Sequence, residues 1–146
     1  MILISHRGNI NNIDINKENL PENIRECIKS GFDVEIDVWK KDGEWFLGHD
    51  SPDYKIDLKF ISQNKTSLWC HAKNLEAFES MLQKDIHCFW HQEDDYTLTS
   101  KGYIWTYPNK PICKNSVIVC KNLKETQHYA NLDIAGICSD FVGVIS

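Results

Sequence analysis

Residues 33–38 read Asp-Val-Glu-Ile-Asp-Val, an alternation of acidic and apolar side chains. Successive side chains of a β-strand point to opposite faces, so this period of two predicts a strand with carboxylates on one face and a core contact on the other. The carboxylates repel one another, and water, a basic partner or a metal ion must offset that repulsion. Histidines lie nearby in the sequence, in residues 5–8 (Ser-His-Arg-Gly) and 48–50 (Gly-His-Asp), and they favour the metal ion.

The rest of the chain alternates apolar runs with helical patterns. Helices are predicted after Asn19, which has an N-cap residue type, after Asn74, and over residues 123–130. Strands are predicted at residues 1–5, 33–39, 67–71, 87–90, 103–106, 116–120 and 134–138, with a short extended piece at 44–47.

Strands that alternate with helices predict an α/β fold with a mostly parallel sheet of about seven strands. A complete TIM-like (β/α) barrel usually needs about 200 residues or more, whereas this chain has 146. We therefore expect a compact or incomplete TIM-like (β/α) barrel that forms a single domain over residues 1–146. The open sheet edges of an incomplete barrel would favour a homodimer.

Composition and charge narrow the class of protein. The formal net charge is −5 and there is no run of basic residues, which argues against a nucleic-acid-binding protein. No segment is long and apolar enough for a membrane span, and the apolar start of the chain lacks the basic region of a signal peptide. The six cysteines are scattered, with no Cys-x-x-Cys pair, so we expect free thiols. Together these features predict a cytoplasmic protein.

Polar residues gather where the predicted strands end. The carboxyl ends of parallel strands meet at one edge of an α/β sheet, which is where such folds place their functional groups. Two of these residues have a second interpretation: His91 precedes an acidic stretch typical of a solvated loop, and Asp140 could be a structural hydrogen-bond acceptor. The polar residues at or near strand ends are His6, Glu35, Asp37, His49, His71, Lys73, His91 and Asp140.

Several short motifs follow one another in the first third of the chain. They are His6-Arg7-Gly8, Glu18-Asn19, Gly31 with Asp33, Glu35-x-Asp37, Asp42-Gly43 and His49-Asp50. In this order, and with this spacing, they resemble the glycerophosphodiester phosphodiesterase family, whose members are metal-dependent phosphodiesterases on (β/α) barrels. Residues 136–140 (Gly-Ile-Cys-Ser-Asp) are similar, more weakly, to the last strand of that family.

The resemblance implies a mechanism. Glu35 and Asp37 would bind a divalent metal ion, and carboxylate oxygens suit Mg²⁺ or Ca²⁺. His6 and His49 would act as general acid and base on the two sides of the scissile phosphate, because histidine titrates near neutral pH. Arg7 would contact a phosphate oxygen. The substrate would be a small phosphodiester, similar to a glycerophosphodiester.

One departure from the family pattern affects the metal ion. The family has Glu-x-Lys at the end of its third strand, where this chain has His71-Ala72-Lys73. Lys73 matches the family lysine and would balance the carboxylates or contact the phosphate. His71 would be the third metal ligand or a polar core histidine. A nitrogen ligand in place of the family's carboxylate lowers the negative charge of the site, so Mn²⁺ and Zn²⁺ become alternative ions.

The short chain leaves the reaction itself open. The segment that follows the His-Asp motif in the family is nearly absent here, so the resemblance does not extend to recognition of glycerol. Two alternatives to hydrolysis therefore remain. One is a non-catalytic module that binds a phosphate or polyol, and the other is a phospholipase-type reaction that forms a cyclic phosphate.

Overall fold

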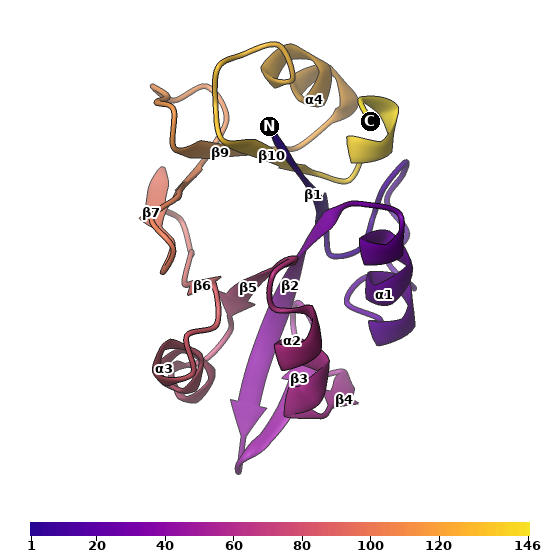
Figure 1. The fold of residues 1–146 in the computed structure, drawn as a ribbon, viewed down its shortest axis with the longest axis vertical. Helices are drawn as coiled ribbons and strands as arrows, with labels where there is room; N and C mark the ends of the chain where they lie inside the picture. Colours follow the sequence, from indigo (N-terminus) through magenta and orange to yellow (C-terminus); the bar gives the residue numbers. More distant parts are fainter.

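Ten strands curl into one open sheet with helices on its outside (Figure 1). The computed structural model describes all residues, 1–146. The strands are β1 (Ile2–His6), β2 (Asp33–Lys41), β3 (Glu44–Leu47), β4 (Tyr54–Ile56), β5 (Leu68–Ala72), β6 (Cys88–Phe89), β7 (Tyr96–Leu98), β8 (Ile104–Thr106), β9 (Ser116–Cys120) and β10 (Gly136–Ser139). The helices are α1 (Pro21–Lys29), α2 (Leu58–Asn64), α3 (Leu75–Gln83), α4 (Leu123–Tyr129) and the short 3₁₀-helix η1 (Val142–Val144).

The sheet is mixed and does not close. Parallel ladders join strands in the order β6-β5-β2-β1-β10-β9-β8. Antiparallel ladders add β3 to β2, β4 to β3 and β7 to β8. No ladder joins β6 to β8; the amide N–H of Ser100, in the chain between them, donates to the carbonyl of Cys88 at 2.8 Å. The predicted α/β class is therefore correct, but the sheet mixes parallel and antiparallel strands, and a TIM barrel is not confirmed.

Four elements were not predicted, namely β4, α2, β7 and η1. Two of them are strands of three residues, too short to display an alternating pattern.

None of the helices has the length and apolar composition needed to cross a lipid bilayer. All six cysteines are free thiols, and only Cys113 is exposed.

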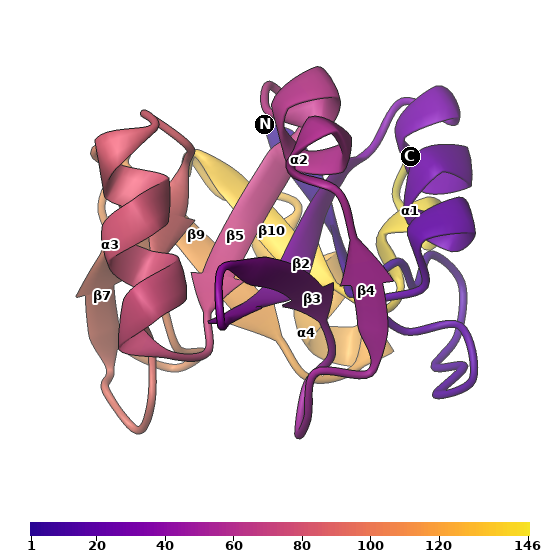
Figure 2. The ribbon, with the colours of Figure 1, turned by 90° about the horizontal axis from the view of Figure 1, so that it is seen from below.

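The central strand is β2, which pairs with β1, β3 and β5. Its apolar residues Val34, Ile36 and Val38 are fully buried and belong to a cluster that includes side chains of α1, α2 and α3. Figure 2 shows these three helices outside β2 and β5. The acidic residues of β2 therefore point to the inner face of the curled sheet, as the alternation of the sequence predicts.

The inner face has two layers of side chains because each strand contributes alternate residues to it. The lower layer is apolar: Ile4, Trp69, Phe89, Trp105, Val117 and Cys138 form one buried cluster. Two positions further along the same strands, towards their carboxyl ends, stand His6, His71, His91, Tyr107, Val119 and Asp140. The packed lower layer thus supports a mostly polar upper layer.

The sequence predicts the N-cap of α3 correctly and the N-cap of α1 wrongly. Asn74 caps α3, since its side chain accepts a hydrogen bond from the N–H of Ala77. Asn19 does not cap α1; Leu20 is the N-cap and makes no side-chain capping bond. Asn19 instead adopts a left-handed backbone conformation with φ 58°, which asparagine tolerates better than most residues. Its side chain is directed into the site described below.

His87 gives the fold a pH dependence that can be measured. Its Nε2 atom lies 2.8 Å from Thr99 Oγ1, and burial, together with the charge of Lys101, lowers its pKa from 6.5 to about 4. Above pH 6.5 the imidazole is neutral in both folded and unfolded protein. As the pH falls from 6.5 to about 4, the unfolded chain takes up the proton first, so the free energy of unfolding should decrease.

Urea unfolding of the wild type and of His87→Gln, followed across this pH range, measures the effect. The variant retains a side chain that can hydrogen-bond to Thr99 but cannot titrate, so its stability should depend less on pH. An equally steep loss of stability in both proteins would contradict this role of His87.

Candidate functional site

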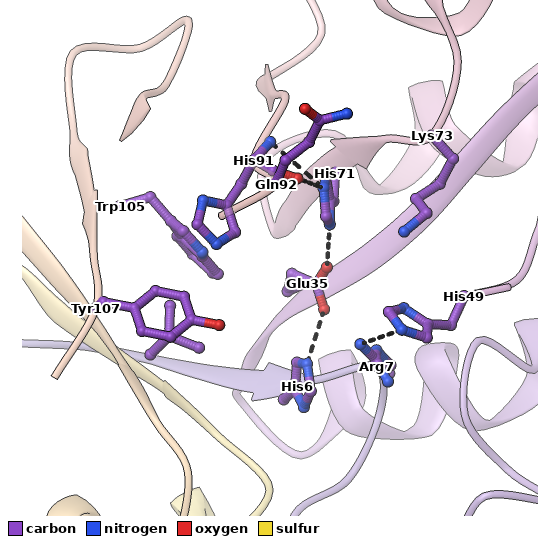
Figure 3. Close-up of a pocket in the computed structure, with 11 residues that line it drawn as sticks. His6, Arg7, Glu35, His49, His71, Lys73, His91, Gln92, Trp105 and Tyr107 are labelled. Carbon is purple, nitrogen blue, oxygen red and sulfur yellow. Dashed lines mark hydrogen bonds and ion pairs between the residues drawn. The ribbon is translucent and has the colours of Figure 1, made fainter. Parts of the chain in front are cut away.

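The upper layer of the inner face surrounds a cavity of about 330 Å³ (Figure 3). It lies at the carboxyl ends of the parallel strands, where the sequence places the candidate residues. Six of the seven predicted site residues line it, and Asp37, the seventh, is fully buried and contacts several of them. The lining residues are His6, Arg7, Glu35, His49, His71, Lys73, His91, Gln92, Trp105, Tyr107 and Val119.

One oxygen of Asp37 is surrounded by donors. Its Oδ2 atom lies 2.9 Å from Asn19 Nδ2 and 3.1 Å from Arg7 Nε. The Nδ1 atom of His49 lies 3.6 Å from the same oxygen. Burial alone would raise the pKa of Asp37, but its contacts with His49 and His71 hold that pKa well below its usual range. Asp37 is therefore an anion in the folded protein.

Asn19 fixes the position of Asp37 from two sides. Its Nδ2 group donates to the carboxylate, and its Oδ1 atom accepts from the backbone N–H of Asp37 at 2.9 Å. The backbone N–H of Asn19 donates to the carbonyl of Arg7 at 2.9 Å, which ties the loop after β1 to the same place. The sequence predicted a helix cap here and missed this contact, because an asparagine ahead of a helix is the common signal for a cap.

The other oxygen of Asp37 and one oxygen of Glu35 have only ion-pair contacts. Glu35 Oε2 and Asp37 Oδ1 are buried and have no hydrogen-bond partner. His71 Nδ1 lies 3.3 Å from Asp37 Oδ1 and 3.8 Å from Glu35 Oε1. Burial and the neighbouring carboxylate of Asp37 raise the pKa of Glu35. Ligand atoms from Glu35, Asp37 and His71 lie within 4.8 Å of one another, so this trio is the set of residues that could hold a metal ion.

Two contacts orient the ring of His71. Its Nε2 atom lies 2.9 Å from the backbone carbonyl oxygen of His91, and its ring stacks on Phe89 with centroids 5.2 Å apart. The backbone nitrogen of His91 lies farther from Nε2, at 3.4 Å, so the shorter contact, with the carbonyl oxygen, favours a hydrogen on Nε2. The Nδ1 atom then faces the two carboxylates. A hydrogen bond from the second ring nitrogen to a backbone carbonyl is common in metal-ligating histidines, so this geometry is compatible with His71 as a ligand.

His6 is paired with a carboxylate from the far end of the chain. Its Nδ1 atom lies 2.9 Å from Asp140 Oδ1, and its Nε2 atom lies 3.9 Å from Glu35 Oε2. Asn9 Nδ2 also donates to Asp140 Oδ1, at 2.8 Å. Burial lowers the pKa of His6, but Asp140 and Glu35 outweigh burial and raise it. Asp140 therefore accepts a hydrogen bond from the ring of His6.

His49 lies at a more exposed part of the cavity wall, beside Arg7 (Figure 3). Its side chain is 41% exposed, and its Nε2 atom lies 3.4 Å from Arg7 Nη2 and 3.6 Å from Asp50 Oδ1. The preceding Gly48 is required for this turn, because a Cβ atom there would overlap the backbone carbonyl oxygen of Ser51. His6 and His49 therefore reach the cavity from different elements.

Two cationic side chains lie between the carboxylates and the cavity. Arg7 has a left-handed backbone with φ 55°, and its guanidinium group contacts Glu18 at 3.4 Å as well as Asp37. Lys73 Nζ lies 3.7 Å from Asp37 Oδ1. Both residues line the cavity, so each can balance the carboxylates and contact an anion bound there.

The wall opposite His49 and Lys73 is aromatic and carries fewer charges. Tyr107 lies 5.3 Å from His91, measured between ring centroids, and both ring nitrogens of His91 are buried without a partner. Trp105 is 4% exposed and serves mainly as core. Gln92 was not singled out from the sequence, since nothing in its local pattern marks a side chain that reaches a cavity.

No protein-family model, curated protein or solved structure matches this chain.

Replacing Asn19 tests whether it holds Asp37. Asn19→Ala removes both hydrogen bonds to Asp37 and places alanine in a left-handed conformation, so we expect a loss of about 2–4 kcal/mol in the free energy of unfolding. Asn12→Ala, in an exposed part of the same loop, is the matched control and should change stability little. Urea unfolding measures both. Equal stability of the two variants would show that the contact with Asp37 contributes nothing.

Proposed function

We propose that this protein is a metal-dependent phosphodiester hydrolase built on a shortened, open (β/α) barrel. The observation that carries the proposal is the trio of Glu35, Asp37 and His71, whose ligand atoms lie within 4.8 Å of one another beside a cavity that His6 and His49 also line. The motif resemblance in the first third of the chain supports the same reaction class. The substrate is a small phosphodiester.

The residues present fit a divalent metal ion. Buried carboxylate oxygens without hydrogen-bond partners are costly, and coordination of a cation is one way to satisfy them. Glu35 and Asp37 offer such oxygens, and His71 offers a nitrogen lone pair beside them. When bound, the ion would polarise a phosphoryl oxygen and offset the charge that develops on it.

The histidines move protons in this proposal. One of them accepts a proton from a water molecule as its oxygen bonds to phosphorus, and the other donates a proton to the oxygen of the leaving group as its bond to phosphorus breaks. The Nδ1 atom of His6 donates to Asp140, which keeps its Nε2 atom directed at Glu35 and the cavity. His49 is the more exposed of the two and lies beside Arg7.

Arg7 and Lys73 bind the phosphate. Both are cationic, both line the cavity, and each has more donor groups than its protein contacts use. A bound phosphodiester would bring its own negative charge to this part of the cavity, where the two cations offset it. Glu18, which does not line the cavity, also accepts a hydrogen bond from Arg7, at 3.4 Å.

Hydrolysis of a generic substrate such as bis(4-nitrophenyl) phosphate tests the proposal. Dialysis against a chelator should abolish turnover and a divalent ion should restore it. His6→Ala and His49→Ala should each lower kcat at least about 100-fold, because each removes one proton-transfer group. His128→Ala replaces an exposed histidine on α4 that lies outside the site and should leave turnover unchanged.

Two results would overturn the proposal. Turnover that survives both the chelator and His6→Ala would exclude this mechanism. Tight binding of inorganic phosphate or glycerol without any product would identify a non-catalytic binding module instead. Phosphorus NMR of the product from a substrate with a neighbouring hydroxyl separates hydrolysis, which gives a phosphomonoester, from internal attack, which gives a cyclic phosphate.

A further inference from the structure

His71 offers a nitrogen ligand beside the two carboxylates, and the type of ligand atom influences which metal ion a site binds most tightly. Mg²⁺ and Ca²⁺ are hard cations that bind through oxygen, and their affinity rises with the number of charged ligands. Imidazole suits first-row transition ions better than it suits either of them. His71 replaces one charged oxygen ligand by a neutral nitrogen, so the donor set is of mixed character.

The surrounding charges reduce the attraction for a hard ion further. Glu35 and Asp37 carry two formal negative charges at most, and the cations Arg7 and Lys73 both contact Asp37, at 3.1 and 3.7 Å. The formal charges of these four groups sum to zero, and the next carboxylates, Glu18 and Asp140, are paired with Arg7 and His6. A nitrogen ligand beside carboxylates that are already paired with cations favours an ion that bonds well to nitrogen.

The orientation of His71 does not depend on a bound ion. The short contact with the carbonyl of His91 favours a hydrogen on Nε2, and stacking on Phe89 holds the plane of the ring. The ring is 14% exposed, so it is held by the protein on most sides. A ligand that is held in this way loses little freedom on binding, and its nitrogen is directed at the carboxylates in advance.

From these observations we propose that the site selects a transition ion, binding Zn²⁺ more tightly than Mn²⁺, and both more tightly than Mg²⁺ or Ca²⁺. The order follows the general affinity of nitrogen and oxygen donor sets for divalent ions. Three protein ligands that border a cavity also match the usual zinc site of an enzyme, which keeps one position open for water or substrate. The inference rests on the proposed metal site and adds the identity of its ion.

Calorimetric titration of the chelator-treated protein with each ion alone tests the order. We expect Zn²⁺ to bind at least about 100-fold more tightly than Mg²⁺ or Ca²⁺. His71→Glu should weaken Zn²⁺ binding at least about tenfold and strengthen Mg²⁺ and Ca²⁺ binding, because it restores a third carboxylate. All proteins carry Cys113→Ser, which removes the one exposed thiol that could bind zinc elsewhere.

His91→Ala is the matched control. It removes a neighbouring imidazole of the same cavity but keeps the backbone carbonyl that orients His71, so it should retain the wild-type order of ions. A second readout requires no variant of His71. Pulsed EPR of the Mn²⁺-loaded wild type should show coupling to an imidazole nitrogen, and that coupling should change when the protein is prepared with ¹⁵N-histidine.

The outcomes separate this inference from the proposed function. Tighter binding of Mg²⁺ or Ca²⁺ than of Zn²⁺, or Mn²⁺ without nitrogen coupling, would overturn the inference while leaving a metal-dependent hydrolase intact. If His91→Ala lost the preference for Zn²⁺ and His71→Glu kept it, the nitrogen ligand would be His91 and the assignment to His71 would be wrong. Failure of every ion to bind would overturn both.

Discussion

Two carboxylates that are buried next to each other on β2 constrain the rest of this structure. Glu35 is 2% exposed and Asp37 is fully buried, and removal of an ionised carboxylate from water costs several kcal/mol unless it is paired. The protein brings Arg7, Asn19 and His71 to Asp37 from three different segments. It nevertheless leaves one oxygen of each carboxylate without a hydrogen-bond partner. A cation bound among these atoms would complete the pairing.

The fold and the site depend on the same alternation of side chains. Val34, Ile36 and Val38 pack beneath the helices, and the residues between them point to the inner face of the sheet. A shift of β2 by one residue relative to β1 and β5 would bury the carboxylates against the helices and direct the valines at the cavity. The register that pairs His6 with Glu35, and Asp37 with His71, therefore builds the site and the core together.

The sequence predicted more of the site than of the sheet. The alternation in β2 and the polar residues at strand ends were sufficient to predict that one cavity is lined by His6, His49, His71 and Lys73. The contact of His6 with Asp140 joins residues 134 positions apart, and only the closeness of β1 to β10 in the fold reveals it. The strands β4 and β7 were missed because antiparallel additions of three residues carry no pattern of their own. Asn19 was misassigned because helix caps and buried carboxylate contacts require the same amide side chain.

Anomalous diffraction from crystals grown with Zn²⁺, recorded on both sides of the zinc absorption edge, tests the central claim most directly. The account predicts one strong peak bonded to Glu35, Asp37 and Nδ1 of His71, with bonds of about 2.0–2.2 Å. It also predicts that His6 and His49 flank that peak from separate sides of the cavity. An empty site in which Nδ1 of His71 donates a hydrogen bond to Asp37, while zinc occupies only surface positions, would contradict it.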